Sequence, residues 1–252
     1  FNGFKLYDNC EDILEELSLN KTYKLKPKER NSHFFENGGF VSFIGLNCSA
    51  LLRYPKFRFR PSHADLLSIE LLNKGESLLR DGGTYSYNTK EKWLNYFSGI
   101  KSHNTIQFDN SEPMPKLSRF LFGNWPEAHS IKFELNNNKS KWAGAYKDYL
   151  GRNHHREISL NNKTWTIIDT ISGQFNEAIL RWRLKPIKWL INGNEINSEE
   201  AVINIESDKL TELSVNMNEG WESLYYNSKT KIKVLEVPLK QNCTVKTTIR
   251  LK

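Results

Sequence analysis

The sequence predicts an all-β protein, built as a large antiparallel β-sandwich with a short helix at its N-terminus. After residue 34, short runs of β-branched and aromatic residues follow one another, and several alternate apolar with polar side chains. This two-residue period is typical of half-buried strands. Gly, Asn, Asp and Pro separate the runs, as expected of turns. Helical patterns do not alternate with the runs, which excludes a parallel βαβ fold and favours a sandwich or barrel.

The first 30 residues have a different sequence pattern from the rest of the chain. Residues 8–18 carry Ile13, Leu14 and Leu17 on one side of a predicted helix, behind residues that can cap it. The basic residues 21–30 are interpreted as a linker. We therefore expect a helical remnant and linker, which would be the end of a preceding domain.

The boundaries that follow are 1–30 for the remnant and linker and 31–252 for the β-sandwich domain. One short helix, over Glu91–Phe97, interrupts the strands. The expected strands are Gly39–Ile44, Ala50–Tyr54, Leu66–Leu72, Thr105–Phe108, Ile131–Leu135, Thr164–Ile171, Ala178–Leu184, Ala201–Ile205, Leu213–Met217, Lys231–Val237 and Val245–Leu251.

Composition narrows the class of protein. The 252 residues are 38% hydrophobic and 12% aromatic, which excludes a disordered chain, and no apolar run has the roughly 18 residues of a membrane span. The formal charge is +7, which suits nucleic acid, an anionic membrane or an acidic polysaccharide. Lysine is spread along the chain, which argues against a nucleic-acid-binding tail. Three cysteines without paired spacing are expected to be free thiols.

Three polar residues stand at the edges of apolar strands: His63, Asp81 and His103. The sequence separation between one of these residues and the next is about the length of one hairpin, so neighbouring antiparallel strands could bring all three together. Two imidazoles and one carboxylate can bind Zn²⁺ or another divalent ion and leave positions open for water or substrate. The alternative is a pair of hydrogen-bonded histidines inside a sandwich.

The residues around them resemble a known family. His63-Ala-Asp-Leu-Leu-Ser, Asp81-Gly-Gly-Thr-Tyr-Ser-Tyr and Ser102-His-Asn-Thr are similar, in order and spacing, to motifs in the C-terminal β-domain of heparinase II/III-like polysaccharide lyases. The resemblance is concentrated in residues 59–109. It implies a β-sandwich of the supersandwich type, joined in the whole protein to an N-terminal α/α toroid, with the active site in the cleft between them.

The resemblance also implies a function, which is cleavage of an acidic, uronate-containing polysaccharide such as a glycosaminoglycan by β-elimination. In that reaction a base removes the C5 proton, an acid protonates the leaving C4 oxygen, and the carboxylate must be neutralised. It further implies a zinc-type metal bound by His63, Asp81 and His103, and a bacterial periplasmic or secreted location. Pro61 stands where many members carry a further, catalytic histidine.

Tyrosines are the remaining candidates for contact with sugar. We expect Tyr96 and His103 to take part in catalysis, and Tyr85, Tyr87 and Trp93 to bind substrate. Cross-strand aromatic packing is an equally good interpretation of each tyrosine. Because the toroid of the family supplies the main catalytic tyrosine, we expect the isolated chain to have little or no lyase activity.

Other interpretations of the sequence remain open. A non-catalytic module that binds acidic glycans, or that only braces a helical partner, would have the same charge and aromatic content. A cupin-like metal enzyme ranks below, since the chain has no His-x-His pair. Adjacent His154 and His155 should point to opposite faces of a strand, and we expect both at the surface. Arg181 and Arg183 share one face, expected to be solvated.

Overall fold

The computed structural model describes residues 31–136, 139–211 and 213–252. Within it, Ser32–Lys252 forms one compact unit. This unit is mostly strand, in large antiparallel sheets with one short α-helix, so the predicted all-β sandwich is confirmed. The helix expected at 8–18 and the linker after it lie outside the described residues.

The first sheet has nine strands, and every pair in it is antiparallel. Eight follow the order β1-β2-β3-β4-β5-β13-β18-β17, and β6 pairs with β13 beside β5. The bounds are β1 His33–Phe35, β2 Phe40–Gly45, β3 Cys48–Arg53, β4 Ile69–Asn73, β5 Glu76–Leu79, β6 Ile106–Phe108, β13 Ala178–Leu184, β17 Asn216–Glu222 and β18 Thr230–Leu239.

The second sheet has eight antiparallel strands in the order β14-β15-β16-β19-β12-β11-β10-β9. A separate hairpin pairs β7 with β8. The bounds are β7 Lys116–Ser118, β8 Leu121–Phe122, β9 His129–Asn136, β10 Lys139–Lys147, β11 Asn153–Asn161, β12 Thr164–Ser172, β14 Leu190–Asn192, β15 Glu195–Asn197, β16 Ala201–Ser207 and β19 Cys243–Leu251.

The core lies between the two sheets. Phe43 of β2 meets Trp165 of β12 edge to face, with ring centroids 5.8 Å apart. The indole of Trp182 on β13 donates a hydrogen bond of 3.3 Å to the hydroxyl of Thr247 on β19. Strands such as β12 and β19 alternate buried with partly exposed residues, so each sheet contributes one apolar face to this layer.

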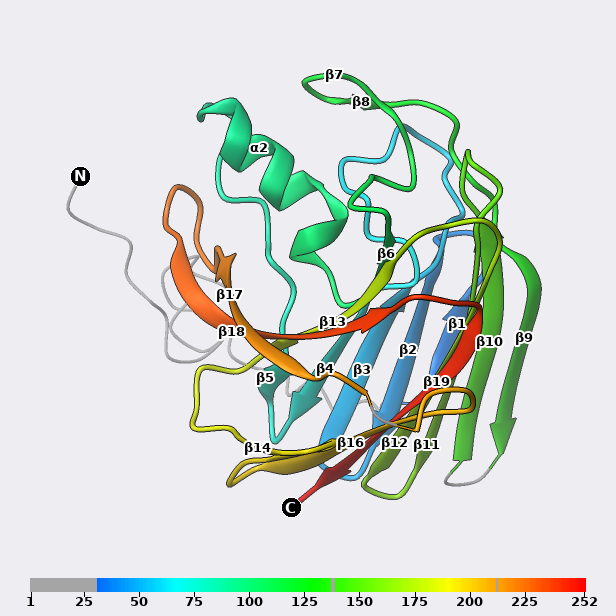
Figure 1. Cartoon of the computed structure of the whole chain (residues 1–252), viewed down its shortest axis with the longest axis vertical. Coiled ribbons are helices and arrows are strands. Elements are labelled where there is room, and N and C mark those ends of the chain that lie inside the picture. Colours follow the sequence, from blue (N-terminus) through cyan, green and yellow to red (C-terminus); the bar gives the residue numbers. More distant parts are fainter. Residues whose placement is uncertain (1–30, 137–138, 212) are drawn as a thin grey trace, which may run out of the picture. The chain divides into compact units, whose positions relative to one another are not determined.

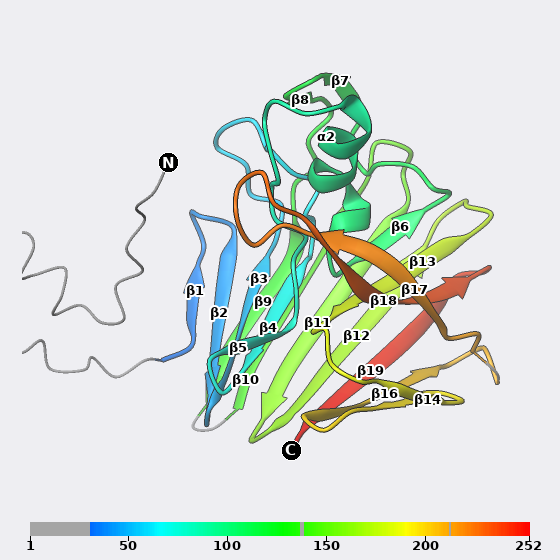
Figure 2. The same cartoon turned by 90° about the vertical axis from the view of Figure 1, so that its left-hand side faces the viewer.

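One end of the sandwich carries the irregular segments. Helix α2 (Glu91–Ser98), the 3-10 turn η1 (Ile100–Ser102), the β7–β8 hairpin and the loop from β3 to β4 gather there (Figure 1, Figure 2). The helix expected at Glu91–Phe97 is therefore confirmed. Over the described ranges, none of the helices is long and apolar enough to cross a membrane.

Several local expectations were wrong. Two of the longest strands, β10 and β11, were not predicted, because their outward positions are charged or polar and dilute the apolar signal. The strand expected from Leu66 begins at Ile69, since Leu67 adopts a left-handed backbone with φ of 54°. The strand expected at Leu213–Met217 lies further along, in β17.

Candidate functional site

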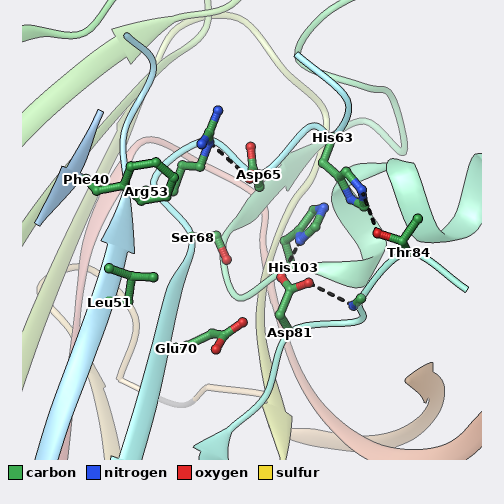
Figure 3. Close-up of a pocket in the computed structure, with 11 residues that line it drawn as sticks. Phe40, Leu51, Arg53, His63, Asp65, Ser68, Glu70, Asp81, Thr84 and His103 are labelled. Carbon is green, nitrogen blue, oxygen red and sulfur yellow. Dashed lines mark hydrogen bonds and ion pairs between the residues drawn. The ribbon is translucent and has the colours of Figure 1, made fainter. Parts of the chain in front are cut away.

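Three chain segments at this end bring His63, Asp81 and His103 to one pocket (Figure 3). His63 lies in the loop between β3 and β4, Asp81 follows β5 by two residues, and His103 comes directly after η1. The three residues, which the sequence singled out, therefore line the same pocket, and their binding of one metal ion stays a prediction.

Asp81 and His103 are directly bonded. His103 Nδ1 lies 2.5 Å from Asp81 Oδ2, and the other carboxylate oxygen accepts the backbone N–H of Gly83 at 2.8 Å. His103 Nε2 lies 3.2 Å from the hydroxyl oxygen of Ser102, which itself donates to the carbonyl of Phe97. With that hydroxyl proton committed, Nε2 is best placed as a donor, so both ring nitrogens carry protons.

The charges of the pair agree with this pattern. Burial alone would raise the pKa of Asp81, but the charge and hydrogen bond of His103 lower it to about 2. Burial likewise opposes a charged His103, yet the Asp81 carboxylate raises the pKa of this imidazole above its usual value. The pair is an imidazolium–carboxylate pair with His103 almost fully covered.

His63 differs from its neighbour. Burial and the nearby positive charge of His103 lower the pKa of His63, so its imidazole is neutral. The two rings lie edge to face with centroids 5.5 Å apart, and His63 Nε2 is 3.4 Å from the hydroxyl of Thr84. The site thus holds a neutral imidazole beside a charged one.

The pocket has a volume of about 240 Å³, and two of its carboxylates were not singled out from the sequence. Asp65 pairs with Arg53 at 3.1 Å. Glu70 points toward the Asp81 side of the pocket (Figure 3), and burial together with the charge of Asp81 raises its pKa to about 7. Glu70 falls within a strand-like run, and nothing in that pattern distinguished it.

The donor types suit a divalent cation, since imidazole and carboxylate are zinc ligands. Across the part of the chain that the structure describes, however, no three His, Cys, Asp or Glu side chains are arranged as a preformed metal-binding group. In this structure His103 and Asp81 bond directly to each other. A cation would replace that direct bond.

The predicted sugar-contacting residues divide into two groups. Tyr87 lines a second hollow that also includes His63. Tyr96 instead accepts hydrogen bonds from the Trp221 backbone at 2.8 Å and from Arg183 at 3.1 Å. Its hydroxyl is therefore directed to the strand β17 side, and it lines none of the three hollows that His63 lines.

Tyr85 and Trp93 belong to that same side. Lys229 donates to the Tyr85 hydroxyl at 3.0 Å and lies 4.7 Å from the centroid of the Trp93 ring. Trp93 packs edge to face on Trp221, with centroids 5.2 Å apart. Both aromatic side chains thus support one another and the β17–β18 hairpin, apart from the His63 pocket. Their role in substrate binding stays a prediction.

Asn104 holds the site in place. Its side-chain amide donates to the carbonyls of Ile69 and Arg80 at 2.9 and 3.1 Å, and its oxygen accepts the backbone N–H of Arg183 at 2.6 Å. These bonds link β4, the end of β5 and β13 around a fully buried amide. His103, the preceding residue, is fixed by this anchor. The Ser-His-Asn-Thr motif thus includes its own positioning residue.

Two further sequence interpretations were wrong. His154 is fully buried, although His155 on the opposite face is half-exposed. Arg181 and Arg183 do share a face of β13, but both are buried. Arg181 pairs with Glu236 at 2.6 Å, and Arg183 bonds to the backbone of Trp221. Internal polar partners, which an alternation pattern does not reveal, stabilise these buried charges.

Comparison with known proteins finds one matching family model and several similar structures. A family model described as "Heparinase II/III-like, C-terminal" matches residues 27–248. A heparinase III structure aligns with a TM-score of 0.76 at 17% identity, over 89% of this chain and 36% of that one. The heparan sulfate lyase HepC from Pedobacter heparinus aligns with a TM-score of 0.74 at 21% identity, over 90% and 37%.

A second heparinase III structure aligns with a TM-score of 0.73 at 14% identity, over 89% of this chain and 37% of that one. The chain therefore spans little more than a third of the length of these structures, and at such identities the likeness concerns the fold. No curated protein sequence matches the chain.

Proposed function

Because this chain belongs to the heparinase II/III-like C-terminal family, we propose that it is the C-terminal domain of a polysaccharide lyase. The parent enzyme would cleave an acidic, uronate-containing polysaccharide by β-elimination. One observation carries the proposal: His63, Asp81 and His103, from three separate segments, converge on a single pocket. A neutral imidazole next to an imidazolium–carboxylate pair is the kind of arrangement that proton transfer beside a carboxylate needs.

The domain would supply one wall of the active-site cleft. β-Elimination needs a base, an acid and a group that neutralises the uronate carboxylate, all held in one geometry. His63 is neutral and borders open space, so it can contact a sugar. Tyr96 bonds away from this pocket, so a catalytic role for it requires approach from the β17 side. The remaining groups would come from a helical N-terminal part of the parent protein.

We also propose a divalent metal at the site, zinc by its ligand types, whose binding would displace a proton from His103 and replace the direct bond between His103 and Asp81. His63, Asp81 and His103 would hold it, and the ion would act as a Lewis acid toward an acidic oxygen of the substrate. Glycosaminoglycans are too large to cross a cell membrane, so this function goes with export of the parent protein to a bacterial periplasm or beyond.

The reaction is tested by the ultraviolet absorbance of the unsaturated uronate product. The parent protein, expressed from its full reading frame, is assayed on heparan sulfate, alginate and other uronate polymers, alongside residues 1–252 alone. We expect turnover by the parent and little or none by the chain, because losing groups that act as a unit costs many orders of magnitude in rate. Absence of product from the parent on every polymer contradicts the lyase proposal.

The metal is tested by mass spectrometry of the purified chain and by zinc titration followed by thermal unfolding. We expect about one zinc per chain and a rise in Tm with zinc, and His63→Gln should lose both. His155→Gln is the matched control, since His155 is a half-exposed histidine on β11. Equal zinc binding by both variants, or no binding by the wild type, contradicts the site.

A non-catalytic glycan-binding or bracing module is the alternative function. Exposed aromatic and basic side chains near His63, namely Lys56, Arg58, Phe59 and Arg60, favour glycan contact in either case. The two functions separate in the parent protein. His63→Gln would abolish product formation in a lyase, whereas a module would bind acidic glycan without producing any unsaturated uronate.

A further inference from the structure

Three hollows meet at His63. The pocket of about 240 Å³ is one of them. A second, of about 330 Å³, extends toward the β7–β8 turn, and a third, of about 490 Å³, extends along the loop between β3 and β4. Arg60, Ser62 and His63 line both of the larger hollows. These two hollows therefore adjoin at Arg60, Ser62 and His63; we call them together the groove, and each is of the size that takes small ligands.

The groove is strongly basic. Its two hollows are lined by Arg53, Lys56, Arg58, Arg60 and Arg119, and among the described residues Asp65 is the one carboxylate that borders them. That carboxylate already faces Arg53. The positive charge of the groove is thus largely uncompensated by its own walls.

The arginines are also short of protein partners. Within the described ranges, Arg58 and Arg60 make no side-chain hydrogen bond or ion pair, and both are exposed. Arg119 uses one nitrogen, Nη2, to donate to the Tyr87 carbonyl at 2.7 Å, which fixes the side chain beside the groove. The same nitrogen lies 3.4 Å from the Thr89 carbonyl, and Nε and Nη1 of Arg119 donate to no other group among the described residues. Guanidinium groups that are not neutralised suit carboxylate or sulfate groups, which they can bind through two hydrogen bonds.

Aromatic rings accompany these cations. Lys56, Phe57, Arg58, Phe59 and Arg60 alternate basic with aromatic residues, and Phe59 is 84% exposed. At the other end Tyr87 is 60% and Phe120 45% exposed, and their rings lie edge to face with centroids 6.2 Å apart. Such exposed aromatic surface is costly in water unless a ligand covers it, and the flat C–H faces of sugar rings can pack on it.

We propose that this groove binds successive sugars of an acidic glycan across His63. Arg58 binds anionic substituents on one side, Arg60 does so where the two hollows adjoin, and Arg119 does so on the other side, where Tyr87 and Phe120 pack against a sugar ring. The choice of a glycan over another polyanion rests on the proposed function; the groove and its charge do not. The arginines thus determine which stretch of the glycan lies over His63.

The test is isothermal titration calorimetry of the whole chain with three probes of equal length. These are a hexameric oligogalacturonate, which carries carboxylates only, a heparin-derived hexasaccharide, which adds sulfates, and neutral maltohexaose. We expect both acidic probes to bind, with affinity that falls as salt rises, and maltohexaose not to bind. The double variant Arg58→Gln/Arg60→Gln should weaken the binding of both acidic probes by about tenfold or more. This is the effect expected from the loss of a hydrogen bond to a charged group.

The matched control is Lys240→Gln/Arg250→Gln, which removes the same charge from exposed side chains elsewhere on the sandwich. It should change the affinity by less than about twofold, the range expected of screened charges beyond a Debye length. Arg119→Gln and Phe59→Ala should each weaken binding, at the two ends of the groove. Equal losses in the groove and control variants would show a diffuse charge effect and overturn the groove.

The outcomes separate this inference from the lyase function. Absence of binding by the wild-type chain overturns the groove even if the parent protein is an active lyase. Binding of the acidic probes that depends on Arg58 and Arg60 supports the groove even if the parent forms no unsaturated product, in which case the lyase proposal alone fails.

Discussion

The domain contains two histidine–aspartate pairs that differ in charge state. At the candidate site, His103 and Asp81 form a charged pair, and the pKa of this histidine is raised. Between the sheets, His154 Nε2 lies 2.7 Å from Asp169 Oδ1 with both side chains fully buried. There, burial lowers the pKa of the histidine.

A third residue explains the difference. Arg156 donates to both oxygens of Asp169, at 2.6 and 3.0 Å. Although burial opposes the charge of Asp169, this guanidinium and His154 hold its pKa at about 2. A second positive charge on His154 would meet Arg156 without further compensation. Asp81 has no such bidentate partner in the described part of the chain, so its histidine carries the balancing proton.

The comparison separates a structural pair from a functional one. Arg156 also donates to the carbonyls of Leu67 and Asn104, at 2.5 and 2.8 Å, so the interior cluster braces the two loops that carry the site. Its charges are satisfied within the fold. The pair at the pocket holds its charge at the edge of a solvent-facing hollow, where a ligand can change it.

The largest expected effect comes from Asp169→Asn. It leaves the charge of Arg156 buried without its carboxylate partner, which costs about 3–5 kcal/mol of unfolding free energy. Asp81→Asn, the same substitution at the pocket, should cost about 1–3 kcal/mol, since Asp81 is 24% exposed and its neighbour can lose the proton. Denaturant unfolding of both variants measures the difference. A larger loss for Asp81→Asn would reverse our assignment of the structural cluster.

The two clusters also differ in how far the sequence reveals them. The motifs around His63, Asp81 and His103, taken together in their order along the chain, predicted that the three residues converge, whereas their spacing alone was a weak signal. His154 was expected at the surface, because adjacent polar residues on a strand carry no sign of which face is buried. The partners that make burial possible, Arg156 and Asp169, lie on β11 and β12 and become neighbours only through strand register.

The same limit applies to the strands. Those with continuous apolar alternation, such as β12 and β19, were predicted nearly to their ends. Strand β10, with lysines outward and Trp142 inward, was missed since sheet pairing rather than its own composition makes it a strand. The basic groove also escaped prediction: its charges come from two loops that only the folded structure brings together.

An effect of intermediate size is expected in the pH dependence of stability. The folded-state pKa of His154 lies below its unfolded value of about 6.5. Between these values the unfolded chain binds the extra proton, so stability is present above about pH 6.5 and is lost as pH falls below it. His154→Gln keeps an N–H donor for Asp169 and removes the titration. The unfolding free energy of the variant should therefore fall less between pH 7 and 5 than that of the wild type, as urea titrations at each pH would measure. Parallel curves would contradict a neutral buried His154.

The smallest expected change in stability is at Asp65, the one acidic side chain of the groove. Its pair with Arg53 is 3.1 Å long and leaves both residues about a quarter exposed, so Asp65→Asn should alter the unfolding free energy by about 1 kcal/mol or less. Its effect on ligand binding should have the opposite sign from the arginine variants. Removing a carboxylate frees Arg53 and takes away repulsion of an anionic sugar worth about 1 kcal/mol at short range in water.

Affinity for the acidic hexasaccharides should consequently rise by about fivefold, a change that calorimetry resolves. Glu134→Gln removes the same charge from an exposed position on β9 in the second sheet and should leave the affinity nearly unchanged. If Asp65→Asn binds the acidic probes more weakly, the carboxylate contacts the ligand or a bound cation rather than opposing it. The groove would then be organised around Asp65 and its neighbour His63 instead of around its arginines.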